Sequence, residues 1–289
     1  IGAGYIGLEL GSVWNRLGSE VTVIEYADSI VPSMDLDIGI TFRNELQKQG
    51  INFLLLSEVT KAKIKNDEVH IDINSIKDKK VNKLVFNKAL LAVGRTPNIE
   101  GMGLEALGIK FSNKGHIAVS QSYETSIEGI YAIGDVIEGP MLAHKASMEG
   151  QAVVDIIIGK NGQVNYNAIP SVVYTSPEVA WVGKNQQELD KYKINYKVGK
   201  FQFSSNSRSK VSGNTTGMIK VYSHSESDKI LGAHIIGNHA GEMIGEFVVA
   251  IEMGATAEDI ALICHAHPTL SESIKEAASL ASYGKTIHS

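Results

Sequence analysis

The chain has 289 residues, of which 43% are hydrophobic, and a formal net charge of −5. This length allows two domains with buried cores. The acidic charge gives no reason to expect nucleic-acid or membrane-surface binding, and no apolar run reaches the roughly 20 residues that span a bilayer. The single cysteine, Cys264, excludes an internal disulfide and favours a reducing compartment.

The first 59 residues alternate between helix and strand patterns. A glycine-rich turn at residues 2–7 opens a helix whose apolar residues recur at helical spacing as far as Gly18. The pattern then predicts a strand, an amphipathic helix and a buried strand, at residues 20–26, 37–49 and 51–59. Only Ile1 precedes the turn, although such a turn normally follows a strand, so we expect that N-terminal sequence is missing.

Strand patterns dominate the middle of the chain. Alternating segments predict a β-meander at residues 61–65, 68–74 and 82–86, and an apolar strand follows at residues 89–93. After a break at residues 95–98, two short strands, a helix and a linker are predicted, at residues 116–119, 130–133, 143–158 and 159–167.

The last part of the chain shows strand patterns followed by helix patterns. The strands are predicted at residues 171–174, 217–222 and 230–236. The helices are predicted at residues 240–253, 256–263 and 271–282. This order suggests an α+β unit that is distinct from the first part.

Gly2, Gly4 and Gly7 form a GxGxxG pattern that opens a helix. Glu25 closes the next strand at the spacing of about 20 residues that is typical of a dinucleotide-binding fingerprint. The glycines would allow a pyrophosphate to approach the backbone, and the N–H groups of the helix would bind it. Glu25 would accept hydrogen bonds from the adenosine ribose and repel a 2′-phosphate, which favours NAD over NADP. The alternative is a glycine-rich turn that serves packing alone.

A second candidate site follows the predicted strand at residues 130–133. Asp135 comes after Gly134 at the carboxyl end of that strand, where α/β sheets bind ligands. The next helix begins at a run whose N–H groups would receive a ligand oxygen, namely Met141, Leu142, Ala143 and His144. An ordinary Gly-Asp turn explains the same pattern.

His267 and Glu272 form the third candidate site. A carboxylate that pairs with an imidazole holds the ring in one tautomer and poises it as a base. Two structural explanations compete, because Thr269 and Glu272 match a capping box, and His265 with His267 could ligate a metal. Two histidines at positions i and i+2, without a third ligand nearby, are a poor zinc site, so no metal is expected. Pro268 should fix an extended backbone at His267.

Together these motifs resemble the pyridine nucleotide–disulphide oxidoreductases over the whole chain, and within that family the branch that oxidises dihydrolipoamide. The resemblance is carried by residues 2–9, 91–98, 130–135, 141–146, 171–180 and 265–272. It implies an α/β fold with three parts. These are a Rossmann-like NAD-binding domain at 1–97 whose first strand is truncated, a C-terminal segment of the FAD-binding and central domain at 98–167, and an α+β dimerisation domain at 168–289.

The resemblance also implies a role for each candidate residue. His267 would be the general base that takes a thiol proton from dihydrolipoamide, and Glu272 would orient it. NAD would contact the first helix and nearby positions, namely Gly2, Ala3, Gly4, Tyr5, Ile6, Gly7, Leu8, Glu9, Glu25, Val59 and Gly94. FAD would contact Asp135, Met141, Leu142, Ala143 and His144.

The implied activity is the oxidation of protein-bound dihydrolipoamide, with electrons passed through a disulfide and FAD to NAD. The implied partners are a second copy of the chain, in a homodimer, and the lipoyl domains of 2-oxo acid dehydrogenase complexes. The family's Cys-x4-Cys redox pair is absent from the sequence, so we expect the chain by itself to be inactive. Cys264 would be a buried bystander.

Two other functions fit the same residues. One is a different flavoprotein disulphide reductase, and the other is a non-catalytic module that binds a nucleotide or dimerises. The expected location is the cytoplasm, with the mitochondrial matrix as the alternative.

Overall fold

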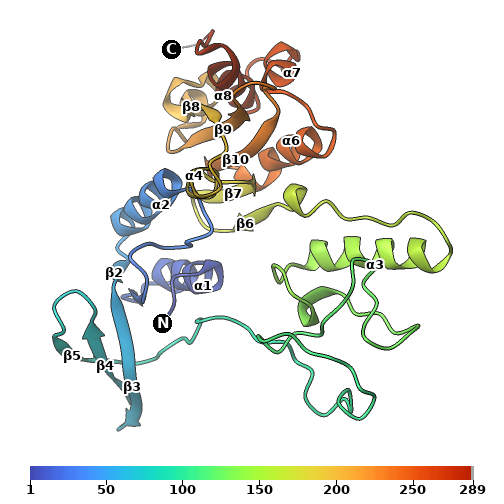
Figure 1. Cartoon of the computed structure of the whole chain (residues 1–289). Helices are drawn as coiled ribbons and strands as arrows, with labels where there is room; N and C mark the ends of the chain where they lie inside the picture. The colour runs from blue at the N-terminus through green and yellow to red at the C-terminus, as the bar shows by residue number, and fades with distance from the viewer. Residues whose placement is uncertain (288–289) are drawn as a thin grey trace. The chain divides into compact units, whose positions relative to one another are not determined.

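The computed structural model describes residues 1–287, which form two compact units (Figure 1). The larger unit comprises Ile1–Val93 together with the chain from Asn167 onward, and the smaller unit comprises Gly94–Tyr166. Within residues 1–287, no helix combines the length and the apolar character that crossing a bilayer requires.

The larger unit begins with the predicted alternation of helix and strand. Helix α1 (Tyr5–Arg16) and helix α2 (Leu36–Lys48) flank the parallel pair β1 (Thr22–Ile24) and β2 (Asn52–Leu54). The predicted strand at residues 51–59 is wrong as a single strand. Leu56 has a φ of +49°, a left-handed conformation that bulky side chains rarely adopt, and the chain breaks there between two strands.

The predicted strand at residues 89–93 is also wrong. Ala92 donates a backbone hydrogen bond to the Ile1 carbonyl over 2.9 Å, and the Ile1 amino group donates to the Leu90 carbonyl over 2.8 Å. This is the hydrogen-bond pattern of parallel strands, but Ile1 is the one ladder partner of this segment within residues 1–287. Leu91 and Val93 are consequently exposed in the structure.

The predicted β-meander is confirmed as an antiparallel sheet of β3 (Ser57–Lys65), β4 (Glu68–Ser75) and β5 (Val81–Phe86). Asn66 and Asp67 form the first turn with φ values of +52° and +61°. Asn and Asp tolerate this region better than other side chains do, which is why the turn was predictable.

The C-terminal part of the larger unit is a five-stranded antiparallel sheet with the order β6-β7-β10-β9-β8. Its strands are β6 (Ser171–Val173), β7 (Glu178–Gly183), β8 (Tyr196–Gln202), β9 (Met218–His224) and β10 (Ile230–Gly237). The prediction missed β7 and β8, and also α4 (Gln186–Lys191), α5 (Ser207–Ser212) and the 3-10 turn η3 (Phe203–Ser205). Both faces of β7 are covered, so its residues do not alternate between apolar and polar.

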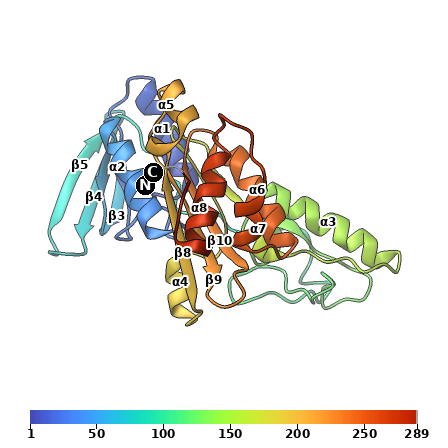
Figure 2. The same cartoon turned by 90° about the horizontal axis from the view of Figure 1, so that it is seen from above.

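Three confirmed helices cover one face of this sheet, as Figure 2 shows: α6 (Ala240–Glu252), α7 (Ala257–Leu262) and α8 (Glu272–Tyr283). The core on this face includes Ile219, Ile235 and Phe247, all fully buried. Alternate residues of the same strands point to the other face, where Val179, Trp181 and Met218 pack with Leu8 and Phe42 of the first helices. The first helices therefore pack directly on the C-terminal sheet.

A buried polar cluster joins these two parts. Lys220 Nζ lies 2.9 Å from Asp35 Oδ1, and the Tyr222 hydroxyl donates to Asp35 Oδ2 over 2.6 Å. Asp35 also caps α2 by accepting from the N–H of Asp37. Burial would raise the pKa of Asp35, but hydrogen bonds from Tyr222 and Lys220 outweigh it and hold the pKa below its usual value.

In the smaller unit, α3 (Ala143–Ile157) is confirmed, and a 3-10 turn, η1 (Gly134–Val136), precedes it. The predicted strands at residues 116–119 and 130–133 are wrong. The structure shows only isolated pairings there, Phe111 with Ile117 and Glu124 with Tyr131. An extended segment needs consecutive ladder partners to become a strand, and residues 94–166 do not supply them. A further 3-10 turn, η2 (Tyr166–Ala168), ends the predicted linker.

Candidate functional site

The glycine-rich turn has the geometry that a dinucleotide phosphate requires. Gly2 has a φ of +97°, and a Cβ there would collide with the Ala92 carbonyl. A Cβ on Gly7 would collide with the Gly2 carbonyl, whereas a Cβ on Gly4 would meet nothing within 4 Å. Two of the glycines are therefore needed for packing, and the third leaves open space beside the start of α1.

Glu25 lies beside this turn, as predicted for a fingerprint acid. Its Oε2 accepts from the Ala3 N–H over 2.6 Å, and its Oε1 accepts from the Ala27 N–H over 2.8 Å. Gly4, the N-cap of α1, has no side chain to cap the helix. A carboxylate is thus held next to open helix N–H groups, as the ribose and pyrophosphate of a dinucleotide require.

The other residues predicted to contact NAD differ in their burial and in their hydrogen-bond partners. Leu8 is fully buried, and its N–H donates a hydrogen bond to the Gly4 carbonyl within the helix. Glu9 accepts a hydrogen bond from the Tyr174 N–H over 2.8 Å, and Val59 packs on the apolar cluster around Ile24. Tyr5 and Ile6 are half-buried in the first turn of α1, and Gly94 belongs to the smaller unit.

The predicted FAD contacts come together within the smaller unit. Asp135 lies in η1, and Met141 to His144 form the entry to α3, whose N-cap, Leu142, makes no side-chain cap. Gly134 packs so closely that a Cβ there would lie 3.2 Å from the Ala146 Cβ. Asp135 is therefore held beside the first turns of α3.

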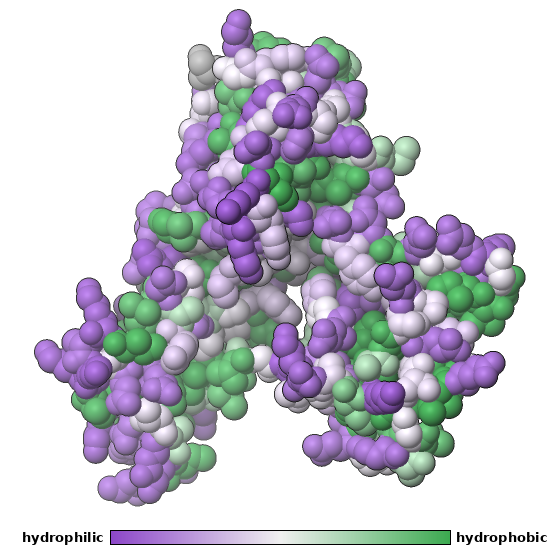
Figure 3. Space-filling view, in the orientation of Figure 1, coloured by the Kyte–Doolittle hydropathy of each residue, from purple (hydrophilic) through white to green (hydrophobic). Residues whose placement is uncertain are grey.

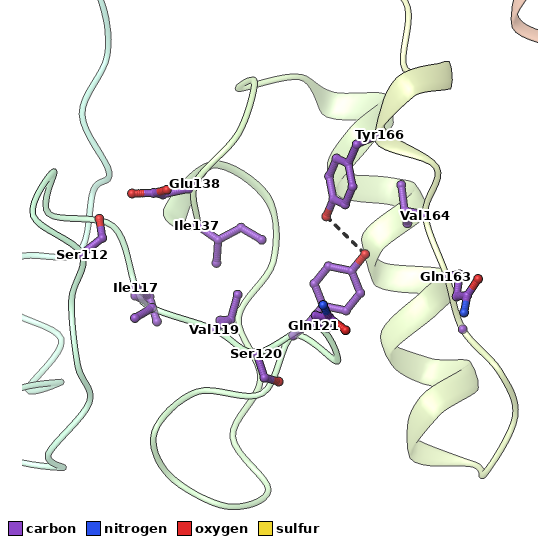
Figure 4. Close-up of a pocket in the computed structure, with 13 residues that line it drawn as sticks. Ser112, Ile117, Val119, Ser120, Gln121, Ile137, Glu138, Gln163, Val164 and Tyr166 are labelled. Atoms are coloured by element: carbon purple, nitrogen blue, oxygen red, sulfur yellow. Dashed lines mark hydrogen bonds between the residues drawn. The ribbon is translucent and has the colours of Figure 1, made fainter. Parts of the chain in front are cut away.

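A pocket of about 560 Å³ also lies in the smaller unit, and Figure 4 shows its lining. Val119, Ile137, Val164 and Tyr166 contribute to its wall. None of the predicted site residues lines it, so its size alone does not mark it as the functional site.

His267 and Glu272 form the predicted pair. His267 Nδ1 lies 2.8 Å from Glu272 Oε1, and the two side chains are 62% and 14% exposed. Glu272 Oε2 accepts from the Thr269 N–H over 2.9 Å. Glu272 therefore holds the imidazole at Nδ1. The ring is largely exposed, and Nε2 lies on its other edge.

The predicted capping box is only half present. The Thr269 hydroxyl donates to the Ala266 carbonyl over 2.7 Å instead of accepting a helix N–H. Helix α8 begins at Glu272, and its N-cap is Ser271, which makes no side-chain cap. The Glu272 carboxylate thus braces the loop before the helix and orients His267.

His265, two residues earlier, has a different environment. Its Nε2 lies 2.7 Å from Glu246 Oε1, its Nδ1 lies 3.1 Å from the Ile263 carbonyl, and its side chain is 6% exposed. No three potential metal ligands gather anywhere within residues 1–287, so these histidines do not share a metal-type cluster. Cys264 is exposed, which corrects the prediction that it is buried, because it lies in the surface loop between α7 and α8.

Sequence reasoning missed two further charged residues beside the predicted FAD contacts. Lys145 and Glu149 are almost completely buried and form an ion pair of 3.0 Å within α3. Their spacing of four residues on a helix of mainly apolar character was the available signal, but such pairs are usually exposed.

Family comparisons cover nearly the whole chain. The model of the pyridine nucleotide-disulphide oxidoreductases matches residues 1–150, and the model of their dimerisation domain matches residues 169–278. Mitochondrial dihydrolipoyl dehydrogenases are 49% identical in Arabidopsis thaliana and 47% identical in Homo sapiens, over 288 and 290 residues. A leghemoglobin reductase of Glycine max is 47% identical over 285 residues.

These comparisons cover 99–100% of this chain, which spans 54–57% of the length of the same relatives. Two solved structures are also similar, with TM-scores of 0.87. LpdA of Mycobacterium tuberculosis is 26% identical, with coverage of 96% of this chain and 60% of its own. The HOCl-induced flavoprotein disulfide reductase RclA of Escherichia coli is 25% identical, with coverage of 97% and 63%.

The predicted α/β fold class with a dimerisation domain is confirmed by these matches and by the structure. Their extent, together with the glycine-rich turn and the His267–Glu272 pair, leads to one conclusion: the chain belongs to the pyridine nucleotide–disulphide oxidoreductase family.

Proposed function

We propose that this chain carries the NAD-binding, dimerisation and part of the FAD-binding regions of a dihydrolipoyl dehydrogenase. The domain boundaries of this proposal are residues 1–97, 98–167 and 168–289. The high identity to relatives with that name supports the proposal. The chain contains one cysteine and so cannot supply an internal redox disulfide, and we expect the chain by itself to be inactive.

The observation that carries the proposal is the exposed His267 ring held by Glu272. A dithiol reacts with a disulfide only as a thiolate, and a thiol pKa of about 8.5 keeps it mostly protonated at neutral pH. Nε2 of His267 would take that proton as general base. Nδ1–H would donate to Glu272, whose negative charge stabilises the imidazolium that forms.

The cofactor roles follow the geometry of the two other sites. NAD would bind at the start of α1, where Gly4 leaves room for the pyrophosphate and Glu25 would accept from the adenosine ribose. FAD would be held by Asp135 and by the entry to α3 at residues 141–144. When bound, FAD supplies the two-electron chemistry between disulfide and NAD.

We further propose that the protein is a homodimer in which His267 serves the active site of the partner subunit. Apolar side chains at and near the ends of α6 and α7 reach the surface, among them Val249, Met253 and Leu262. Figure 3 shows apolar surface over the region of α6. Such exposed apolar surface within a dimerisation domain is suited to a self-complementary interface.

The reaction partners and the compartment are part of the same proposal. Lipoyl domains of 2-oxo acid dehydrogenase complexes would deliver the dithiol. Several of the most similar relatives are mitochondrial by name, which favours the mitochondrial matrix over the cytoplasm.

The competing function is another disulphide or haem-protein reductase. The leghemoglobin reductase of Glycine max is as similar to this chain as the human dihydrolipoyl dehydrogenase is, so identity does not separate the two. The two functions differ in what His267 would do. Oxidation of a dithiol needs a base that removes a thiol proton, and His267 would supply that base.

The test uses the intact protein that contains this chain, purified with FAD. Dihydrolipoamide should reduce NAD, and NADP should be a much poorer acceptor because of Glu25. A protein that binds FAD but fails to reduce NAD with dihydrolipoamide would overturn the proposal. Faster turnover with another disulphide or with a haem protein would support the competing function.

A further inference from the structure

The smaller unit contains a buried ion pair to which the proposed function assigns no role. Lys145 and Glu149 are one turn apart on α3, and their side chains are 1% and 0% exposed. Removing two charges from water is unfavourable, and such a pair persists only where further hydrogen bonds satisfy both groups. The partners of this pair therefore indicate its purpose.

Both members of the pair hold the peptide groups of a single residue. The Gly134 N–H donates to Glu149 Oε2 over 2.8 Å, and Lys145 Nζ donates to the Gly134 carbonyl over 3.2 Å. Gly134 has a φ of +74° and directly precedes Asp135. The ion pair thus fixes the residue that aims Asp135.

Two other contacts hold the clamp in place. The Tyr166 hydroxyl donates to Glu149 Oε1 over 2.7 Å and lies 3.2 Å from the Tyr123 hydroxyl, the interaction dashed in Figure 4. Burial, followed by the hydrogen bonds with Tyr123 and Glu149, raises the pKa of Tyr166, so it remains a neutral donor. The Lys145 stem passes under the same loop, since a Cβ on Gly139 would lie 3.0 Å from Lys145 Cε.

We propose that Glu149 is a positioning residue for FAD, which holds the Gly134–Asp135 turn at a fixed place relative to the start of α3, and that Lys145 balances its buried charge. Neither side chain has to touch the cofactor, because both are almost completely buried. The inference rests on the proposed FAD site at Asp135 and residues 141–144. It adds that the geometry of this site depends on an acceptor for the Gly134 N–H.

The test compares two double variants of the intact protein. Lys145→Met with Glu149→Gln removes both charges but keeps an amide oxygen that accepts from the Gly134 N–H. Lys145→Met with Glu149→Met removes both charges and the acceptor, with similar side-chain length. Neither leaves an unpaired buried charge, so their difference reports on the clamp rather than on charge burial.

Two measurements are made on each variant: the FAD dissociation constant, and the rise in melting temperature that FAD causes in the apoprotein. We expect the Gln variant to bind FAD nearly as the wild type does. The Met variant should bind at least about tenfold more weakly, the lower end for residues that orient a ligand from behind. Its FAD-induced rise in melting temperature should shrink.

A purely structural role would lower the melting temperatures of the apo and FAD-loaded forms equally and leave the FAD-induced rise unchanged. Equal behaviour of the two double variants overturns the inference, whether both bind FAD, both lose it or both fail to fold. Failure of the wild type to bind FAD would instead overturn the proposed function.

The same helix offers a matched control. Asp155, near the end of α3, and Lys160, just after the helix, form a long contact of 4.0 Å, with side chains 45% and 69% exposed. Lys160→Met with Asp155→Gln removes the same two charges far along the chain from Gly134. This variant should leave FAD affinity unchanged.

Discussion

The His267–Glu272 segment and the Asp35–Lys220–Tyr222 cluster each pair a carboxylate with a basic side chain. They differ in whether that basic side chain is exposed or buried. In the first, a base and its carboxylate are neighbours in sequence and the base is 62% exposed. In the second, the charged groups are 185 residues apart in sequence and almost fully buried. An exposed base can meet a substrate, whereas a buried pair can only hold two parts of the protein together.

The largest effect should come from breaking the buried cluster. Asp35→Ala leaves the Lys220 ammonium buried and removes the acceptor for Tyr222, and we expect a loss of about 3–5 kcal/mol in the free energy of unfolding. Urea unfolding followed by fluorescence of the buried Trp181, in a Trp14→Phe background, measures this loss.

Asp37→Ala provides the control for this prediction. Asp37 also contacts Lys220, over 3.1 Å, but its side chain is 48% exposed. Its removal should cost less than about 1 kcal/mol. Equal costs for the two variants would contradict the assigned difference between the buried and the exposed carboxylate.

The second prediction concerns the exposed pair. His267→Gln in the intact protein should lower kcat at least about a hundredfold, the lower end of the contribution of a general acid or base. Because the ring is exposed, the free energy of unfolding should change by no more than about 0.5 kcal/mol. Steady-state kinetics and urea unfolding measure the two quantities.

His265→Gln is the matched control, since this ring also pairs with a glutamate but is buried. It should destabilise the protein by about 1–3 kcal/mol through loss of a buried hydrogen bond. A near wild-type rate for His267→Gln would show that His267 is structural.

The smallest effect is a pH dependence on the buried side. His234 is fully buried at the edge of the cluster, and its burial lowers its pKa. The unfolded chain then binds a proton below about pH 6.5 that the folded chain does not, so stability falls as the pH falls. The loss reaches up to about 1.4 kcal/mol per pH unit for this group.

His234→Gln should flatten the dependence of the unfolding free energy on pH between 5 and 7. Unfolding curves at several pH values, compared with the wild type, measure the change in slope. An unchanged slope would show that His234 titrates equally in both states.

Local features of the fold could be predicted because short-range sequence determines them. The Gly2–Gly7 turn, the Asn66–Asp67 turn and the helices α2, α6 and α8 each carry their signals within a few residues. Strand β7 was missed because two covered faces erase the alternation that marks a strand. The segments at 89–93 and 116–119 were overpredicted, because an apolar extended pattern becomes a strand only where consecutive partners lie beside it.

The sequence by itself determined the local motifs on which the proposed chemistry depends. A GxGxxG turn with a following acid, and a histidine five residues before a glutamate, are local patterns with local physical meaning. Only the tertiary structure decided which charges are covered. It buried Lys145, Glu149 and Lys220, and it exposed His267 and Cys264. It also buried the His265 ring and paired it with a different glutamate from that of His267. Burial depends on what packs against a residue from elsewhere in the chain, and no local pattern specifies that neighbour.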